Sequence, residues 1–125
     1  MEPRQHVHVL VVEDEFLLSD MICDALRDDG FAVAAARNAD EALDHVESGK
    51  QVDVVFTDVN LDDGMDGATL ARVLRARRPE LPIVYSSGLM TESSLRPMVS
   101  RSMFIPKPYR PGEVSALLRR MTEGM

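Results

Sequence analysis

Acidic side chains stand at two points of the sequence where a buried strand is expected to end. Glu13 and Asp14 follow the apolar run Val7–Val12, and Asp58 follows the run Val52–Thr57. Carboxylates held close together repel one another, which raises the pKa of a carboxyl unless a cation compensates. Magnesium binds one or two carboxylates together with water and phosphate oxygens. The cluster therefore predicts a site for Mg²⁺, with Mn²⁺ as a substitute.

Other polar side chains also stand at strand ends. Ser87 ends the fourth apolar run, Lys107 follows the fifth, and Asn60 comes two residues after Asp58. A metal ion and a lysine ammonium can neutralise phosphoryl oxygens while a serine hydroxyl donates to another, and a carboxylate can then attack phosphorus in line. The set predicts phosphoryl transfer to Asp58, with formation of an acyl phosphate, assisted by Lys107 and Ser87.

Apolar runs of strand length alternate with amphipathic stretches along the chain. The expected strands are Val7–Val12, Phe31–Ala36, Val52–Thr57, Ile83–Ser87 and Met103–Ile105. Apolar residues at helical spacing predict helices over Leu17–Leu26, Asn38–Val46, Gly67–Arg78 and Pro111–Met121. Strict alternation predicts an α/β fold, a doubly wound five-stranded parallel sheet with helices on both faces. The polar residues after the strands then share one edge of the sheet.

The stretch Thr91–Arg101 gives a weaker helical signal. Pro97 has no backbone N–H and breaks or shifts a helix that contains it. We therefore expect a fourth helix that is short or irregular.

Composition limits the classes of function. The chain has 125 residues, 45% hydrophobic and 28% charged, so we expect one domain over residues 1–125, with a core over about 7–121 and no output domain. A net charge of −7 argues against nucleic-acid binding. The single cysteine, Cys23, excludes an internal disulfide, and the apolar runs are too short to span a membrane, which favours a cytoplasmic protein.

Five motifs in register resemble the receiver domains of bacterial two-component response regulators. They are Val11-Val12-Glu13-Asp14-Glu15, Val55-Phe56-Thr57-Asp58-Val59-Asn60-Leu61, Met65-Asp66-Gly67, Pro82-Ile83-Val84-Tyr85-Ser86-Ser87-Gly88 and Ile105-Pro106-Lys107-Pro108. The resemblance covers roughly residues 7 to 121. Two departures are familiar variants: Glu13 replaces the more frequent aspartate, and Leu61–Met65 looks one residue longer than usual. The third, Pro97, leaves the dimerisation or partner mode of the output face open.

The resemblance implies a role for each residue of the acidic set. Asp58 is the phosphoacceptor, and Asp14 and Asp58 contact the metal directly. Glu13 acts through water, and Asn60 contributes its backbone carbonyl.

The same resemblance implies a switch. Ser87 matches the switch hydroxyl, Phe104 the aromatic whose rotamer follows phosphorylation, and Lys107 the lysine that pairs with phosphate. The Lys107–Pro108 peptide bond is cis in that family, and Gly88 keeps the approach to the phosphate open.

The implied function is a stand-alone receiver in two-component or phosphorelay signalling. It accepts a phosphoryl group from the phosphohistidine of a sensor histidine kinase or a histidine phosphotransfer protein, and then binds a downstream target or a second copy differently. It is not an enzyme beyond its own phosphorylation and dephosphorylation. Two alternatives stay open: a phosphorylation-independent binding module of receiver fold, and a receiver fragment of a larger hybrid kinase.

Two enzyme classes fit the sequence poorly. A flavodoxin relative needs a hydroxyl-rich phosphate loop after the first strand, where Glu13-Asp14-Glu15 repels phosphate. An aspartyl phosphatase needs a second aspartate two residues after its nucleophile, and Phe16 stands there instead.

Several residues also have simpler interpretations. Strand alternation directs only one of Ser86 and Ser87 into the site, and the spacing before Gly88 favours Ser87. Phe104 is as consistent with core packing as with a switch. The remaining groups read as solvated surface: His6, His8 and His45, and the basic string Arg72, Arg75, Arg77 and Arg78.

Overall fold

A five-stranded parallel sheet forms the centre of the computed structural model, which describes residues 6–61, 64–89 and 91–123. Its strands are β1 (His8–Val12), β2 (Ala32–Ala36), β3 (Val54–Asp58), β4 (Ile83–Ser87) and β5 (Ser102–Pro106). They lie in the order β2-β1-β3-β4-β5, and all neighbouring pairs are parallel. The strand order reverses between β1 and β3, so the predicted doubly wound topology is confirmed.

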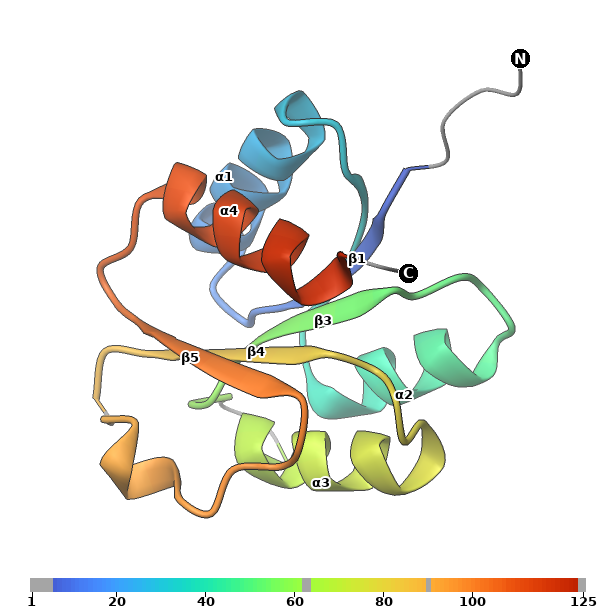
Figure 1. Cartoon of the computed structure of the whole chain (residues 1–125), viewed down its shortest axis with the longest axis vertical. Helices are drawn as coiled ribbons and strands as arrows, with labels where there is room; N and C mark the ends of the chain where they lie inside the picture. The colour runs from blue at the N-terminus through green and yellow to red at the C-terminus, as the bar shows by residue number, and fades with distance from the viewer. Residues whose placement is uncertain (1–5, 62–63, 90, 124–125) are drawn as a thin grey trace.

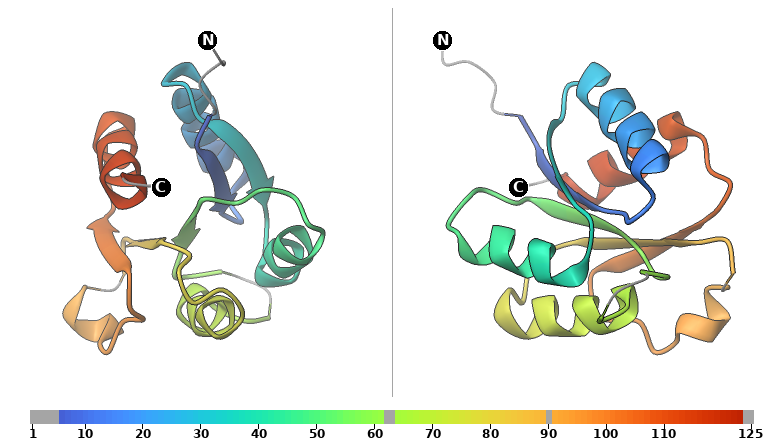
Figure 2. Two further views of the ribbon diagram at one scale, coloured as in Figure 1. Left: turned by 45° about the vertical axis from the view of Figure 1, so that its right-hand side comes forward. Right: turned by 180° about the vertical axis from the view of Figure 1, so that it is seen from behind.

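Helices cover both faces of the sheet. Figure 1 shows α1 (Phe16–Asp28) and α4 (Pro111–Thr122) on one side, with α2 (Ala39–Glu47) and α3 (Gly67–Arg77) on the other. The view from behind in Figure 2 shows the same two layers. The predicted helices are therefore present, with ends that differ by a few residues from the sequence pattern.

Burial explains why the central strands read as continuous apolar runs. Every residue of β3 and β4 is buried, because helices cover both faces of these strands. One core cluster lies toward α2 and α3 and includes Leu10, Val55 and Leu70. A second lies toward α1 and α4 and includes Phe56 and Leu118.

Side-chain caps fix the starts of α2 and α3. Asn38 accepts a hydrogen bond from the Glu41 backbone N–H at 2.8 Å. Asp66 accepts one from the Thr69 N–H at 2.8 Å, which starts α3 directly after the loop that follows β3. The position of α3 relative to the end of β3 is thus set locally.

The weak fourth helix is a single 3₁₀ turn, η1 (Ser93–Leu95), which confirms the expectation of a short or irregular element. Both Arg96–Pro97 and Lys107–Pro108 are cis peptide bonds, the second as the resemblance implies. The longer loop expected over Leu61–Met65 stays a prediction, because Asp62 and Asp63 within it lie outside the described residues. Within the described ranges, no helix is both long and apolar enough to cross a membrane.

Candidate functional site

Three carboxylates meet at the carboxyl edge of the sheet. Glu13 and Asp14 follow β1, and Asp58 ends the adjacent strand β3. One oxygen from each of the three lies within 4.8 Å of the others, although Glu13 is only 5% exposed and Asp58 only 8%. Oxygen donors at this spacing suit a hard divalent cation, so the residues present fit the magnesium ion that the sequence predicts.

Lys107 brings a positive charge from β5 into this acidic cluster. Its Nζ donates to Asp58 Oδ2 at 3.0 Å and to Glu13 Oε1 at 3.2 Å. Burial lowers the pKa of Lys107, but the hydrogen bond to Asp58 and the charge of Glu13 outweigh it, so the net shift is upward. The lysine is therefore a cation held between two carboxylates.

Glu13 is the most perturbed acid of the site. Burial raises its pKa to about 7, and the neighbouring Asp58 charge adds to the rise, against the hydrogen bond from the Glu15 N–H and the charge of Lys107. A carboxyl with this pKa carries a proton part of the time at neutral pH. Binding of a cation there must displace that proton.

A hydrogen-bond chain connects Ser87 to Asp58 through Asn60. The Ser87 hydroxyl donates to Asn60 Oδ1 at 2.7 Å, and the Asn60 backbone N–H donates to Asp58 Oδ1 at 3.1 Å. Ser87 Oγ also accepts from the Leu89 N–H at 3.1 Å. The resemblance implies a role for Asn60 through its backbone carbonyl only. The contact of its side chain with Ser87 was not predicted, because it joins residues 27 apart in the chain.

Phe104 lies farther from the acidic cluster, in the middle of β5. It pairs in register with Tyr85 and packs, partly buried, against the core beneath α3. Its role as a switch stays a prediction.

Gly67 allows α3 to begin against the phosphoacceptor candidate. A Cβ at this position would overlap the Asp58 carbonyl oxygen and lie 2.9 Å from Val59 Cα. The Gly67 N–H donates to the Val59 carbonyl at 2.9 Å. The glycine of the Met65-Asp66-Gly67 motif therefore holds the loop after β3 close to the site.

Tyr109 is a site neighbour that sequence reasoning missed. Its ring meets Phe56 edge-on, with 5.5 Å between centroids. Burial raises the pKa of its phenol, and the Glu13 and Asp58 charges raise it further. An aromatic residue two positions after Lys107 was the available signal.

Two adjoining pockets open beside these residues. The smaller, of about 280 Å³, is lined by Asp58, Asn60, Gly88, Leu89 and Lys107. The larger, of about 450 Å³, is mostly apolar and is lined by Leu18, Met21, Gly88, Lys107, Pro108 and Tyr109. Gly88 and Lys107 line both pockets. The pocket beside Asp58 therefore adjoins the apolar pocket beside α1.

Comparison with known proteins agrees with this geometry. The family model described as the response regulator receiver domain matches residues 9–119. Sensor kinase CckA of Brucella abortus (strain 2308) is 34% identical over 118 residues, covering 92% of this chain and 12% of that protein. Nitrogen assimilation regulatory protein NtrX of Azorhizobium caulinodans is 28% identical over 118 residues, covering 92% of this chain and 26% of that protein.

A solved structure matches over nearly the whole fold. The crystal structure of a response regulator receiver protein from Sinorhizobium medicae WSM419 has a TM-score of 0.88 and 29% identity, covering 96% of this chain and 97% of that chain. The chain spans only 12% and 26% of the length of the two curated relatives above. On the family match, the chain belongs to the response regulator receiver domains, the phosphoacceptor modules of two-component signalling.

Proposed function

We propose that Asp58 is the phosphoacceptor and takes its phosphoryl group from a phosphohistidine in the presence of Mg²⁺. The observation that carries this assignment is the convergence of Lys107 Nζ on Asp58 and Glu13, with Asp14 in the same acidic cluster. The domain would be a single receiver unit over residues 1–125, located in the cytoplasm.

The chemistry is an in-line transfer. A carboxylate oxygen of Asp58 forms a bond to phosphorus while the bond between phosphorus and the donor imidazole nitrogen breaks, and its electron pair returns to the imidazole. Mg²⁺, held by Asp14, Asp58 and the Asn60 carbonyl, with Glu13 through water, would neutralise charge on the phosphoryl oxygens.

The protein's own side chains do the remaining work. The Lys107 ammonium neutralises a second phosphoryl oxygen, and the Ser87 hydroxyl leaves Asn60 to donate to a third. Attack by water on the same phosphorus breaks the bond to the Asp58 oxygen and releases inorganic phosphate, which returns Asp58 to its carboxylate. The chain therefore catalyses only its own phosphorylation and dephosphorylation, and Ser87 with Phe104 would transmit the state of the site.

The surface beside the site supports a protein phosphodonor. Phe16 and Leu17 are 73% and 75% exposed at the start of α1, and Leu89 is 85% exposed at the rim of the smaller pocket. Exposed apolar side chains of this kind mark protein contacts. A sensor kinase or a histidine phosphotransfer protein would dock here, and a downstream target or a second copy would recognise the phosphorylated form.

The test is the intact mass of the protein after incubation with acetyl phosphate and Mg²⁺. The expected result is a gain of one phosphoryl group in the parent, and none in Asp58→Asn or in the presence of a chelator. Labelling of Asp58→Asn to the same extent would contradict the assignment. No labelling of the parent by acetyl phosphate or by any histidine kinase would instead favour the phosphorylation-independent binding module.

A further inference from the structure

Positive charge is concentrated on one part of this acidic protein. Residues 67–101 hold six of the 14 lysines and arginines but only two of the 21 acidic residues. These residues form α3, β4, η1 and the segment that leads into β5, and Figure 1 shows α3 and η1 on the same side of the sheet. The face they form is therefore basic, although the chain has a net charge of −7.

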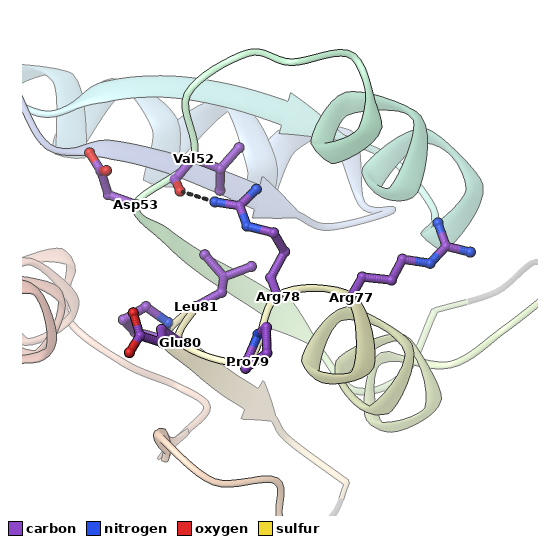
Figure 3. Close-up of a pocket in the computed structure, with 8 residues that line it drawn as sticks. Val52, Asp53, Arg77, Arg78, Pro79, Glu80 and Leu81 are labelled. Atoms are coloured by element: carbon purple, nitrogen blue, oxygen red, sulfur yellow. Dashed lines mark hydrogen bonds between the residues drawn. The ribbon is translucent and has the colours of Figure 1, made fainter.

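Two of these arginines are neutralised by acidic residues. Arg77 pairs with Glu47 of α2, and Arg96 pairs with Glu92 one turn before it. Arg78 extends into a pocket of about 320 Å³ at the opposite edge of the sheet, where it donates to the Val52 carbonyl at 3.4 Å. Figure 3 shows Arg78 reaching toward Val52 while Arg77 points away from it.

The remaining three arginines, Arg72, Arg75 and Arg101, form what we call the α3 basic surface. None of them has an ion pair with an acid among the described residues. Arg72 and Arg75 are three residues apart on α3, so they share one face of the helix. Arg72 and Arg101 are exposed, whereas Arg75 is partly buried.

Backbone carbonyls hold Arg75 in place. It donates to the Ser100 carbonyl through Nε at 3.1 Å and through Nη2 at 2.6 Å, and to the Arg78 carbonyl at 2.8 Å. These bonds fix its position without cancelling its charge. Burial lowers the pKa of Arg75 and the Arg101 charge lowers it further, with Tyr85 opposing.

Arg101 adds a further cation, on a backbone turn that the fold holds in place. Its φ is +53°, in the left-handed region that L-residues other than asparagine, aspartate and histidine seldom adopt. Its carbonyl accepts the Ile83 N–H at 3.1 Å, which ties this turn to the start of β4. Arg75 is therefore held by hydrogen bonds, and the Arg101 charge lies near enough to act on it. Like charges gathered in this way favour a bound anion.

We propose that the α3 basic surface binds an acidic segment of a partner protein, rich in aspartate and glutamate. Arginine forks match carboxylates, and a short segment can lie over three cations without meeting the acidic remainder of the molecule. A nucleic acid extends its charge well beyond such a patch, where the overall −7 charge repels it. The surface lies apart from the Asp58 site, so this inference does not depend on phosphoryl transfer.

The test is a titration of the ¹⁵N-labelled protein with octaglutamate at low salt. The chemical shifts of the backbone amides are measured by NMR at each step. The expected shifts are confined to residues 69–78 and 99–103. Shifts centred elsewhere, or none at all, would overturn the proposal. So would tighter binding of an oligouridylate of the same length at this surface, because nucleic acid would then be the ligand.

Two double variants distinguish binding at this surface from nonspecific attraction of the peptide to positive charge elsewhere on the protein. R72Q/R101N removes two of its charges, and asparagine tolerates the left-handed conformation at 101. R37Q/R120Q removes two exposed arginines outside the surface. R72Q/R101N is expected to raise the Kd for octaglutamate about five- to tenfold, which is the loss expected for two exposed ion pairs. R37Q/R120Q is expected to raise it less than about twofold. Equal losses in the two pairs would overturn the proposal.

Discussion

Two adjacent serines at the end of β4 have different surroundings. The Ser87 hydroxyl contacts Asn60 within the site, whereas the buried Ser86 hydroxyl finds no hydrogen-bond partner among the described residues. Strand alternation directs the two side chains to opposite faces of the sheet. The sequence favoured Ser87 for the site from its spacing to Gly88 alone, and the structure supplies the physical difference between the two serines.

This difference predicts opposite behaviour of two alanine variants. Ser87→Ala loses a donor to the phosphoryl group, so labelling by acetyl phosphate should slow by about tenfold or more. Ser86→Ala removes a hydroxyl that has no partner within the described part of the chain, so it should label at the parental rate and be no less stable. Labelling rates and thermal unfolding check both, and equal slowing in the two variants would contradict the site geometry.

Glu13 predicts how metal affinity depends on pH. Its pKa of about 7 means that the carboxyl is mostly protonated at pH 6 and mostly ionised at pH 8. Because the metal requires the ionised form, Mg²⁺ affinity should rise roughly tenfold over this interval. Titration of Mg²⁺ by calorimetry measures it, and Glu13→Gln should bind more weakly with a flatter pH profile. The same steep profile in Glu13→Gln would assign the proton to another group.

The same pKa sets the sign of a stability effect. Glu13 is raised above its ordinary value of 4.5, so the metal-free folded protein holds this proton more tightly than the unfolded chain. The associated stability is present below about pH 4.5 and is lost as the pH rises through about 7.

At the scale of elements, the start of α3 depends on Gly67. Gly67→Ala places a methyl group against the Asp58 carbonyl, which should lower the free energy of unfolding by about 2–3 kcal/mol and reduce labelling. Gly112→Ala in the first turn of α4 is a matched control, because nothing lies within 4 Å of a Cβ there. It should be neutral or slightly stabilising. Denaturant unfolding compares the two, and similar values would contradict the close approach at Gly67.

The types of the elements were predictable because continuous apolar runs of strand length alternate with stretches in which apolar residues recur at helical spacing. Element ends were less so: the run Val52–Thr57 predicts a strand two residues too early, since pairing with β1 begins only at Val54. Val52 is buried without belonging to the strand. Burial gives the apolar pattern, whereas the strand boundary depends on a partner strand elsewhere in the sequence.

At the scale of the whole molecule, the site exists because β1, β3 and β5 end at one edge of the sheet. The convergence of Glu13, Asp58 and Lys107 was predictable because strands and helices alternate along the chain, which places the ends of parallel strands at one edge of the sheet. The Asn60 side-chain contact and the position of Tyr109 were not, because both depend on the packing of loops from different strands. The α3 basic surface likewise appears only when Arg101 folds back beside Arg75.

This convergence predicts how removal of each charge changes stability. Asp58→Asn keeps Lys107 paired with Glu13 and removes a neighbouring like charge, so the free energy of unfolding without metal should change by less than about 1 kcal/mol. Lys107→Ala leaves two buried carboxylates without their cation and should cost up to about 3–5 kcal/mol at pH 8. Both variants should keep the fold and lose phosphate-dependent signalling. Circular dichroism with denaturant checks this, and unfolding of both would contradict a site at the rim of the sheet.

The most direct test of the phosphoacceptor is to identify the residue that is modified. After labelling with acetyl phosphate and Mg²⁺, borohydride reduces an aspartyl phosphate to homoserine, which peptide sequencing by mass spectrometry locates. The expected product is homoserine at position 58 and at no other aspartate. Homoserine at Asp14 or at another acid, with Asp58 unchanged, would contradict it.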